Sequence, residues 1–192
     1  MRAAKSMSAN SGVIGPAAPT VKVLVTGGAG VGKSCFLRAA QRGRATLPGQ
    51  PGAVGEVGYA TLSSGVTVVL HVTPELRRWW WVWDHLALGA TSAVVLVDTT
   101  RLPVSYPALD YLDARALPYL VAINRPLGGP RNRHEIRDAL RVSAQVPVLT
   151  CDATEPASVL AVLHRLASPV IPPQHHVRPS HHPLRTEGRR LS

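Results

Sequence analysis

The stretch that decides the fold is VKVLVTGGAGVGKSCFLRAAQR, residues 21–42. Residues 21–26 form a short apolar run rich in β-branched side chains, which predicts a buried strand. Residues 34–42 have the composition of a helix. Between the two lies GGAGVGKS, residues 27–34, which fits the pattern G-x-x-x-x-G-K-[ST]. A strand, a glycine-rich turn and a helix in this order predict a phosphate-binding loop.

Each residue type in this loop has a chemical part. Glycines let the backbone turn tightly, so that successive N–H groups point at phosphate oxygens. We expect Gly32 to open the helix, whose N-terminus carries a partial positive charge. Lys33 would reach the β and γ phosphates, and the Ser34 hydroxyl would hold Mg²⁺. The residues predicted to contact phosphate are Gly27, Gly28, Ala29, Gly30, Val31, Gly32, Lys33, Ser34 and Cys35.

The remainder of the body alternates strand and helix patterns. Strands are predicted at residues 67–72, 92–98, 118–124 and 146–150, helices at 74–88, 104–115, 133–141 and 156–167, and a Gly/Pro-rich loop at 43–58. Strands separated by helices form a mostly parallel sheet that is covered on both faces. The sequence therefore predicts an α/β fold that binds its ligand at the carboxyl ends of the strands.

Composition narrows the class of protein. The chain has 192 residues and a formal net charge of +10, with 45% hydrophobic and 17% charged residues, as in a globular domain. Two cysteines are too few for a disulfide framework or a zinc site. No apolar run could span a bilayer, and the N-terminus lacks the apolar core of a signal peptide. We expect a cytoplasmic protein with one domain at 21–167 and disordered tails at 1–20 and 168–192, the second basic and rich in His and Pro. The positive charge is interpreted as solvated tails in an arginine-biased chain, and no sequence-specific nucleic-acid binding is expected.

Four further segments carry a family resemblance: TVVLHVTPELRRWWWVWD, SAVVLVDTTRL, YPALDYLDARALPYLVAIN and VLTCDATEPASVLAVL. With the loop, they make the chain resemble the small Ras-like GTPases of actinomycete conservon operons, often labelled ATP/GTP-binding proteins. The resemblance covers about residues 21–167. It implies a P-loop NTPase with a six-stranded Ras-like sheet that binds GTP/GDP or ATP/ADP with Mg²⁺. The partners it implies are roadblock-type, DUF742-type and sensor-kinase-like proteins, with recruitment to the membrane face through them.

The resemblance also assigns base-binding residues. The family carries Asn-Lys-x-Asp after its fifth strand; here Asn124 matches, and Arg125 would stack on the base as the lysine does. The Asp position is Leu127, which cannot accept hydrogen bonds from guanine, so the choice between guanine and adenine stays open. Asp152 and Ala153 match the last base-contacting turn, where backbone N–H groups would face the base.

The segment implied to act in hydrolysis departs from the family sequence Gly-Thr-Pro-Gly-Gln-Glu. Glu75 replaces the glycine that senses the γ-phosphate, and Leu76 replaces the glutamine that orients the attacking water. The predicted strand at 67–72, which corresponds to the family's third strand, ends without an acid that could support Mg²⁺. Asp98 ends the predicted strand at 92–98, which corresponds to the family's fourth strand, and is interpreted as structural. The catalytic residue thus stays unassigned, and we expect hydrolysis to be slow or partner-dependent.

Four tryptophans lie close together after this segment. On a helix they point to more than one face, so one or two are expected to pack on the sheet. The alternatives for the others are an exposed partner surface and packing under loops. The predicted partner surface consists of Trp79, Trp80, Trp81 and Trp83. Two functions follow: a nucleotide-dependent regulatory switch with weak hydrolysis, and a pseudo-GTPase scaffold that docks signalling partners through this segment without turnover.

Overall fold

A computed structural model describes residues 19–41, 55–74, 76–124 and 132–168; for residues 76–80 only the helix is described. The elements are β1 (Thr20–Gly27), α1 (Lys33–Ala40), β2 (Val57–Thr61), β3 (Thr67–Val72), α2 (Leu76–Ala87), β4 (Ser92–Val97), η1 (Leu102–Ser105, a 3₁₀ turn), α3 (Tyr106–Ala114), β5 (Tyr119–Asn124), α4 (Arg133–Leu140), β6 (Val148–Cys151) and α5 (Pro156–Ala167). Strands and helices alternate along most of this order, as the sequence predicts.

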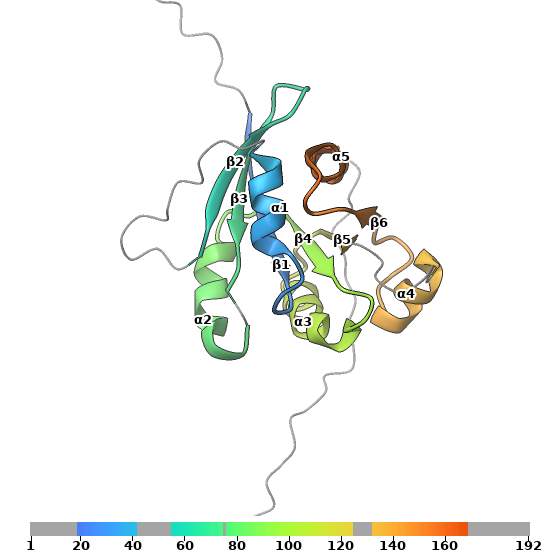
Figure 1. Cartoon of the computed structure of the whole chain (residues 1–192). Helices are drawn as coiled ribbons and strands as arrows, with labels where there is room; N and C mark the ends of the chain where they lie inside the picture. Colours follow the sequence, from blue (N-terminus) through green and yellow to red (C-terminus); the bar gives the residue numbers. More distant parts are fainter. Residues whose placement is uncertain (1–18, 42–54, 75, 125–131, 169–192) are drawn as a thin grey trace, which may run out of the picture.

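The strands form one six-stranded sheet in the order β2-β3-β1-β4-β5-β6 (Figure 1). β1 lies in the interior of the sheet and pairs in parallel with both β3 and β4. The pairs β4–β5 and β5–β6 are also parallel, whereas the edge strand β2 runs antiparallel to β3. The predicted six-stranded, mostly parallel α/β sheet is therefore confirmed.

Helices cover both faces of the sheet, and alternate side chains along the strands pack into two separate hydrophobic cores. In β1, Val23 and Val25 pack into a core with side chains of α1 and α5. Leu24 points to the other face, into a core with side chains of α2, α3 and α4. Because both faces are buried, the inner strands are continuous apolar runs; all six residues of β4 are buried.

The structure departs from the sequence prediction at two places. Val57 and Gly58 belong to β2, although they lie within the predicted loop at 43–58. Glycine is uncommon in strands, so Gly58 obscures β2 in the sequence pattern. Glycine is needed there because a Cβ at Gly58 would lie 2.5 Å from Leu37 Cδ1 of α1. The predicted helix at 104–115 divides into η1 and α3, which has a proline in its first turn. The other predicted elements begin and end within two residues of their observed bounds.

The predicted tails at 1–20 and 168–192 lie almost entirely outside the described residues. Within the part of the chain that the structure describes, no helix has both the length and the apolar character needed to cross a bilayer.

Candidate functional site

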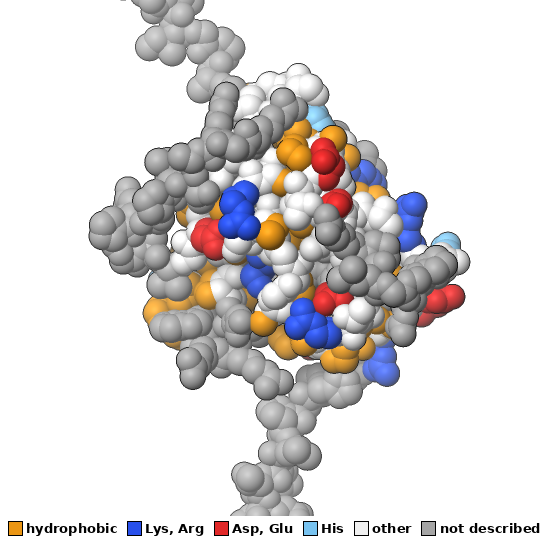
Figure 2. Space-filling view, viewed as in Figure 1, with side chains coloured by type: hydrophobic (Ala, Val, Ile, Leu, Met, Phe, Trp, Pro, Cys, Tyr) orange, Lys and Arg blue, Asp and Glu red, His pale blue; other side chains and the backbone are white. Residues whose placement is uncertain are grey.

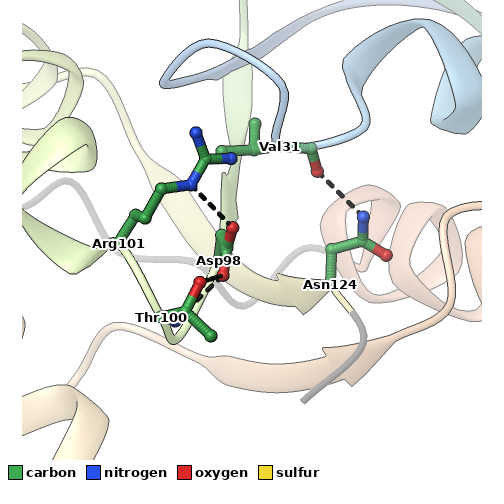
Figure 3. A network of polar contacts seen from close by, with 5 residues as sticks. All are labelled: Val31, Asp98, Thr100, Arg101 and Asn124. Atoms are coloured by element: carbon green, nitrogen blue, oxygen red, sulfur yellow. Dashed lines mark hydrogen bonds and ion pairs between the residues drawn. The ribbon is translucent and has the colours of Figure 1, made fainter. Parts of the chain in front are cut away.

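The candidate site lies where β1 ends and α1 begins. Residues 28–32 connect the two elements, and the ends of β4 and β5 adjoin this connection (Figure 3). This is the edge at which the carboxyl ends of the parallel strands meet, where α/β proteins commonly bind ligands. The predicted phosphate-contacting segment therefore sits where the fold favours binding.

Gly32 caps the start of α1 in a conformation that requires glycine. Its φ angle is +99°, and a Cβ there would lie only 2.5 Å from Asn124 Nδ2. The first helical hydrogen bond follows at once, from Phe36 N to Gly32 O at 2.9 Å. The first turn of α1 holds no acidic residue, so no carboxylate of that turn offsets the positive end of the helix. The loop thus leads directly into a helix N-terminus that favours an anion.

The Lys33 side chain lies against the loop from which it projects. Its ammonium group donates to Gly28 O at 2.8 Å and to Gly27 O at 3.1 Å. These carbonyls hold the ammonium group at the loop. Phosphate oxygens would be stronger acceptors, because their negative charge adds Coulomb attraction to the hydrogen bond.

The predicted metal ligand, Ser34, is engaged by an acid that sequence reasoning did not single out. Ser34 Oγ donates to Glu56 Oε1 at 2.6 Å. Glu56 immediately precedes β2, and its only sequence signal is that it is the sole acid in residues 43–58. A hydroxyl oxygen is a ligand type that Mg²⁺ accepts, and a carboxylate beside it favours a cation, so the residues present fit Mg²⁺. The described residues contain no group of three or more His, Cys, Asp or Glu side chains that could hold a metal, so phosphate oxygens would have to complete the coordination.

Asn124, predicted to contact the base, ties three segments of the site together. Its Nδ2 donates to Val31 O of the phosphate loop at 2.8 Å, and its Oδ1 accepts from Ala153 N at 2.9 Å. Asn124 ends β5, whereas Ala153 follows β6, so one amide joins the loop to two other strand ends. Figure 3 shows the bond from Asn124 to Val31.

The turn after β6 differs from the sequence expectation. Backbone N–H groups there were expected to face the base, but each finds an acceptor within the protein. Ala153 N donates to Asn124, Asp152 N donates to Ser158 Oγ at 2.9 Å, and Thr154 N donates to Asp152 Oδ1 at 2.9 Å. The cause is local, since short polar side chains accept from nearby backbone in such turns. Arg125 and Leu127 lie outside the described residues.

Asp98 and Arg101 form a charged pair beside the loop. Asp98 Oδ1 accepts from Thr100 Oγ1 at 2.6 Å and from Thr100 N at 2.9 Å, and Oδ2 pairs with Arg101 Nε at 3.0 Å (Figure 3). The Thr100 hydroxyl, followed by the Arg101 guanidinium, lowers the pKa of Asp98 below its ordinary value. Both carboxylate oxygens serve the turn after β4, which agrees with the structural interpretation of Asp98.

Arg101 is a second residue that sequence reasoning missed. A Cβ at Gly30 would lie 3.3 Å from Arg101 Nη2, so the guanidinium group lies over the phosphate loop. Its side chain is 48% exposed, so its charge is accessible to an approaching anion. No sequence pattern marks this role, because Arg101 reaches the loop from the turn after β4.

The segment after β3 is held to β1 at Thr73. Thr73 is buried and donates from N to Val25 O at 3.0 Å and from Oγ1 to Thr26 Oγ1 at 3.0 Å. Glu75 and the side chain of Leu76 lie outside the description. The unassigned catalytic residue therefore stays unassigned.

The tryptophans separate into a buried and an exposed member. Trp83 is 1% exposed, its Nε1 donates to Pro74 O at 3.1 Å, and its ring packs edge-on against Tyr111 with centroids 4.9 Å apart. The prediction of Trp83 as partner surface is wrong, because this position of α2 faces the sheet. Trp81, two residues earlier on the opposite side of the helix, is 49% exposed. The side chains of Trp79 and Trp80 lie outside the description.

Charge on the visible face does not gather into one basic patch. In Figure 2 the Lys and Arg side chains are scattered, with acidic side chains between them.

No protein-family model and no curated protein matches the sequence. Solved structures do match the fold. The G domain of FeoB from Methanococcus jannaschii superposes with a TM-score of 0.58 at 17% identity, over 78% of this chain and 96% of that one. The cytosolic domain of the T. maritima FeoB iron transporter in its apo form gives 0.63 at 19% identity, over 82% and 67%. The T. maritima FeoB G domain gives 0.55 at 21% identity, over 77% and 94%.

This chain has the fold of a G domain. Identities of 17–21% establish the fold alone, and the narrower resemblance to conservon-type GTPases stays a prediction. Within the G-domain fold, the loop that bears Lys33 and Ser34 continues β1 into α1, as a P-loop does.

Proposed function

We propose that this protein binds a purine nucleoside di- or triphosphate with Mg²⁺ at residues 27–35 and acts as a regulatory switch in the cytoplasm. The observation that carries the proposal is the phosphate loop itself. Gly32 opens α1 with φ +99°, and the Lys33 ammonium lies at the loop carbonyls. The G-domain fold supports the same ligand class.

Each part of the site would contribute differently to binding of the nucleotide and Mg²⁺. Lys33 would exchange its carbonyl acceptors for phosphate oxygens, and the N-terminus of α1 would add favourable dipole interactions. Mg²⁺ would neutralise charge on the phosphates, with Ser34 Oγ as a protein ligand. Asn124 would keep the loop and the base-side turn in register, because it bonds to Val31 and Ala153.

Hydrolysis is proposed to be slow unless a partner supplies the missing groups. At Leu76 the family glutamine is replaced by a side chain without a donor or acceptor, so it cannot orient water. The nucleotide state would be read out near α2, which begins directly after this segment. Single-turnover hydrolysis of bound GTP and ATP should be slow, and Leu76→Gln should increase the rate.

The deciding experiment is a calorimetric titration of nucleotide-stripped protein with GTP, GDP, ATP and ADP in the presence of Mg²⁺. Lys33→Ala should weaken binding about 10- to 100-fold, because a hydrogen bond from a charged group contributes about 1.5–3 kcal/mol. Lys22→Ala is the matched control: Lys22 lies near the start of β1, where it bonds to Leu88 O at 2.8 Å. Failure of all four nucleotides to bind, or an equal loss in the control, would contradict the proposal.

The same titration addresses the base. A large preference for GTP and GDP would mean that Leu127 is tolerated in a guanine site. Equal affinities for the guanine and adenine nucleotides would identify a relaxed P-loop protein.

A second candidate is the pseudo-GTPase scaffold, which Trp81 favours because a half-exposed indole on α2 suits a docking contact. Its proposed partners are roadblock-type, DUF742-type and sensor-kinase-like proteins. Binding of each should be measured with and without nucleotide, for the wild type and Trp81→Ala. Binding that needs Trp81 but not nucleotide would favour the scaffold, and binding that needs nucleotide would favour the switch.

A further inference from the structure

The end of β3 cannot supply the acid that a P-loop cation site usually has. In P-loop NTPases Mg²⁺ is held by the serine or threonine of the loop and by an acidic side chain. Here β3 ends at Val72, which is 5% exposed and belongs to the core shared with α1 and α5. The carboxylate has to come from elsewhere if the cation is to be held in this way.

Glu56 lies directly across from that position on the neighbouring strand. β2 and β3 are antiparallel with Val57 opposite His71, so the next pair is Glu56 and Val72. The hydrogen bond from Val72 N to Glu56 O, 2.8 Å long, continues the ladder by this one pair. The acid that is absent at the end of β3 is therefore present one strand away.

Close packing of the backbone before β2 against the end of β3 fixes the position of Glu56. Gly55 has a φ angle of +111°, and a Cβ at Gly55 would lie 2.6 Å from Val72 O. The chain thus passes over the end of β3 at a distance that only glycine permits. Glu56 follows Gly55 and lies opposite Val72 in the β2–β3 ladder. Its side chain is exposed and contacts Ser34.

The contact places a carboxylate against the hydroxyl that would bind the cation. Ser34 Oγ donates to Glu56 Oε1 at 2.6 Å, across 22 residues of sequence. While the hydroxyl proton is directed at the carboxylate, the oxygen lone pairs are available to a cation. The negative charge of the carboxylate also favours a divalent ion beside it, as partners of metal ligands generally do.

We propose that Glu56 is the carboxylate of the Mg²⁺ site: it orients the Ser34 hydroxyl and places a negative charge beside the cation, in the role that an acid at residue 72 would have had. This inference rests on the proposed nucleotide binding. Glu56 is a positioning residue, because it acts on the cation through Ser34.

The test is the affinity of the nucleotide complex for Mn²⁺, followed by the electron paramagnetic resonance signal of the free ion. The protein is first loaded in EDTA with whichever of GDP, GTP, ADP and ATP binds most tightly, and this step gives the nucleotide affinity in the absence of metal. EDTA is removed before Mn²⁺ is added. Glu56→Gln keeps an oxygen acceptor for Ser34 but removes the charge, whereas Glu56→Ala removes both. Far-UV circular dichroism confirms that each variant is folded.

The matched control is Glu135→Gln. Glu135 is an exposed acid in the first turn of α4, which packs by β6 at the opposite edge of the sheet from β2. The control removes the same charge far from Ser34 and should leave Mn²⁺ affinity within about twofold of the wild type.

We expect Glu56→Gln to weaken Mn²⁺ binding about 10- to 100-fold, the usual effect of losing a partner of a metal ligand, and Glu56→Ala to weaken it at least as much. Metal-free nucleotide affinity should not fall. Unchanged Mn²⁺ affinity in both variants, or an equal loss in Glu135→Gln, would overturn the inference alone. Tighter Mn²⁺ binding would also overturn it, because Glu56 would then compete with the cation for Ser34. If the wild type binds no nucleotide, the proposed function fails and this inference with it.

Discussion

Replacing Asn124 with alanine should destabilise the protein even when no nucleotide is bound. The change leaves Ala153 N without its acceptor and Val31 O without its donor, in residues that are 0% and 2% exposed. Each buried polar group that loses its partner costs about 1–3 kcal/mol. Because the bonds are only partly buried, the lower part of that range applies, and the free energy of unfolding should fall by about 2–4 kcal/mol.

Urea unfolding of the nucleotide-free protein, followed by far-UV circular dichroism, measures this loss. With an m-value of about 2 kcal/mol/M, the midpoint should fall by about 1–2 M. Asn132→Ala is the control, because Asn132 Oδ1 caps α4 through one 3.3 Å bond from His134 N and its loss should cost about 1 kcal/mol. If Asn124→Ala costs no more than the control, Asn124 does not hold the loop, and our reasoning about its bridging role is refuted.

Three further outcomes are expected. Trp83→Ala should lower the free energy of unfolding by about 3–5 kcal/mol, whereas Trp81→Ala should stay within about 0.5 kcal/mol, both measured by urea unfolding. Burial raises the pKa of Tyr111 to about 12. The folded protein therefore favours the protonated Tyr111 hydroxyl, and this contribution to stability is complete below the unfolded pKa of about 10 and is lost as pH rises toward 12. Tyr111→Phe should therefore lose less stability than the wild type between pH 10 and 12. At pH 8 a thiol reagent should label half-buried Cys35 faster than Cys151, whose pKa is raised by burial.

Each of these outcomes has a clear opposite. Equal destabilisation by the two tryptophan variants would contradict their different burial. A Tyr111→Phe profile parallel to that of the wild type between pH 10 and 12 would mean that this hydroxyl ionises normally. Faster labelling of Cys151 would show that β6 opens readily.

The sequence predicts the parts of the site that are contiguous in the chain. Residues 21–42 carry the strand, the glycines and the helix together, so local pattern alone locates the phosphate loop. The inner strands were equally predictable, because strands buried on both faces are continuous apolar runs. Gly58 concealed β2, and its reason is tertiary, since the glycine makes room for Leu37.

Contacts between distant segments could not be predicted in the same way. Glu56 meets Ser34 only because β2 pairs with β3 in one particular register. Helical spacing shows that Trp81 and Trp83 point in different directions, but neighbouring apolar residues hide which direction faces the sheet. Arg101 reaches the loop from the turn after β4, where nothing in the sequence distinguishes it from other surface arginines.

The interior position of β1 has a consequence for biosynthesis. β1 is the first described strand to leave the ribosome, yet its two neighbours in the sheet are β3 and β4. Val23 can pair only after Leu70 has been made for one side and Ser92 for the other. Until those residues emerge, both of its edges are unpaired and open to association with other chains. The phosphate loop continues from this strand and cannot be shaped earlier. Slowing translation before β4 should therefore lengthen the time during which the β1 edge that later pairs with β4 is unpaired, and aggregation should increase. Supplying chaperones at that stage should reverse the effect.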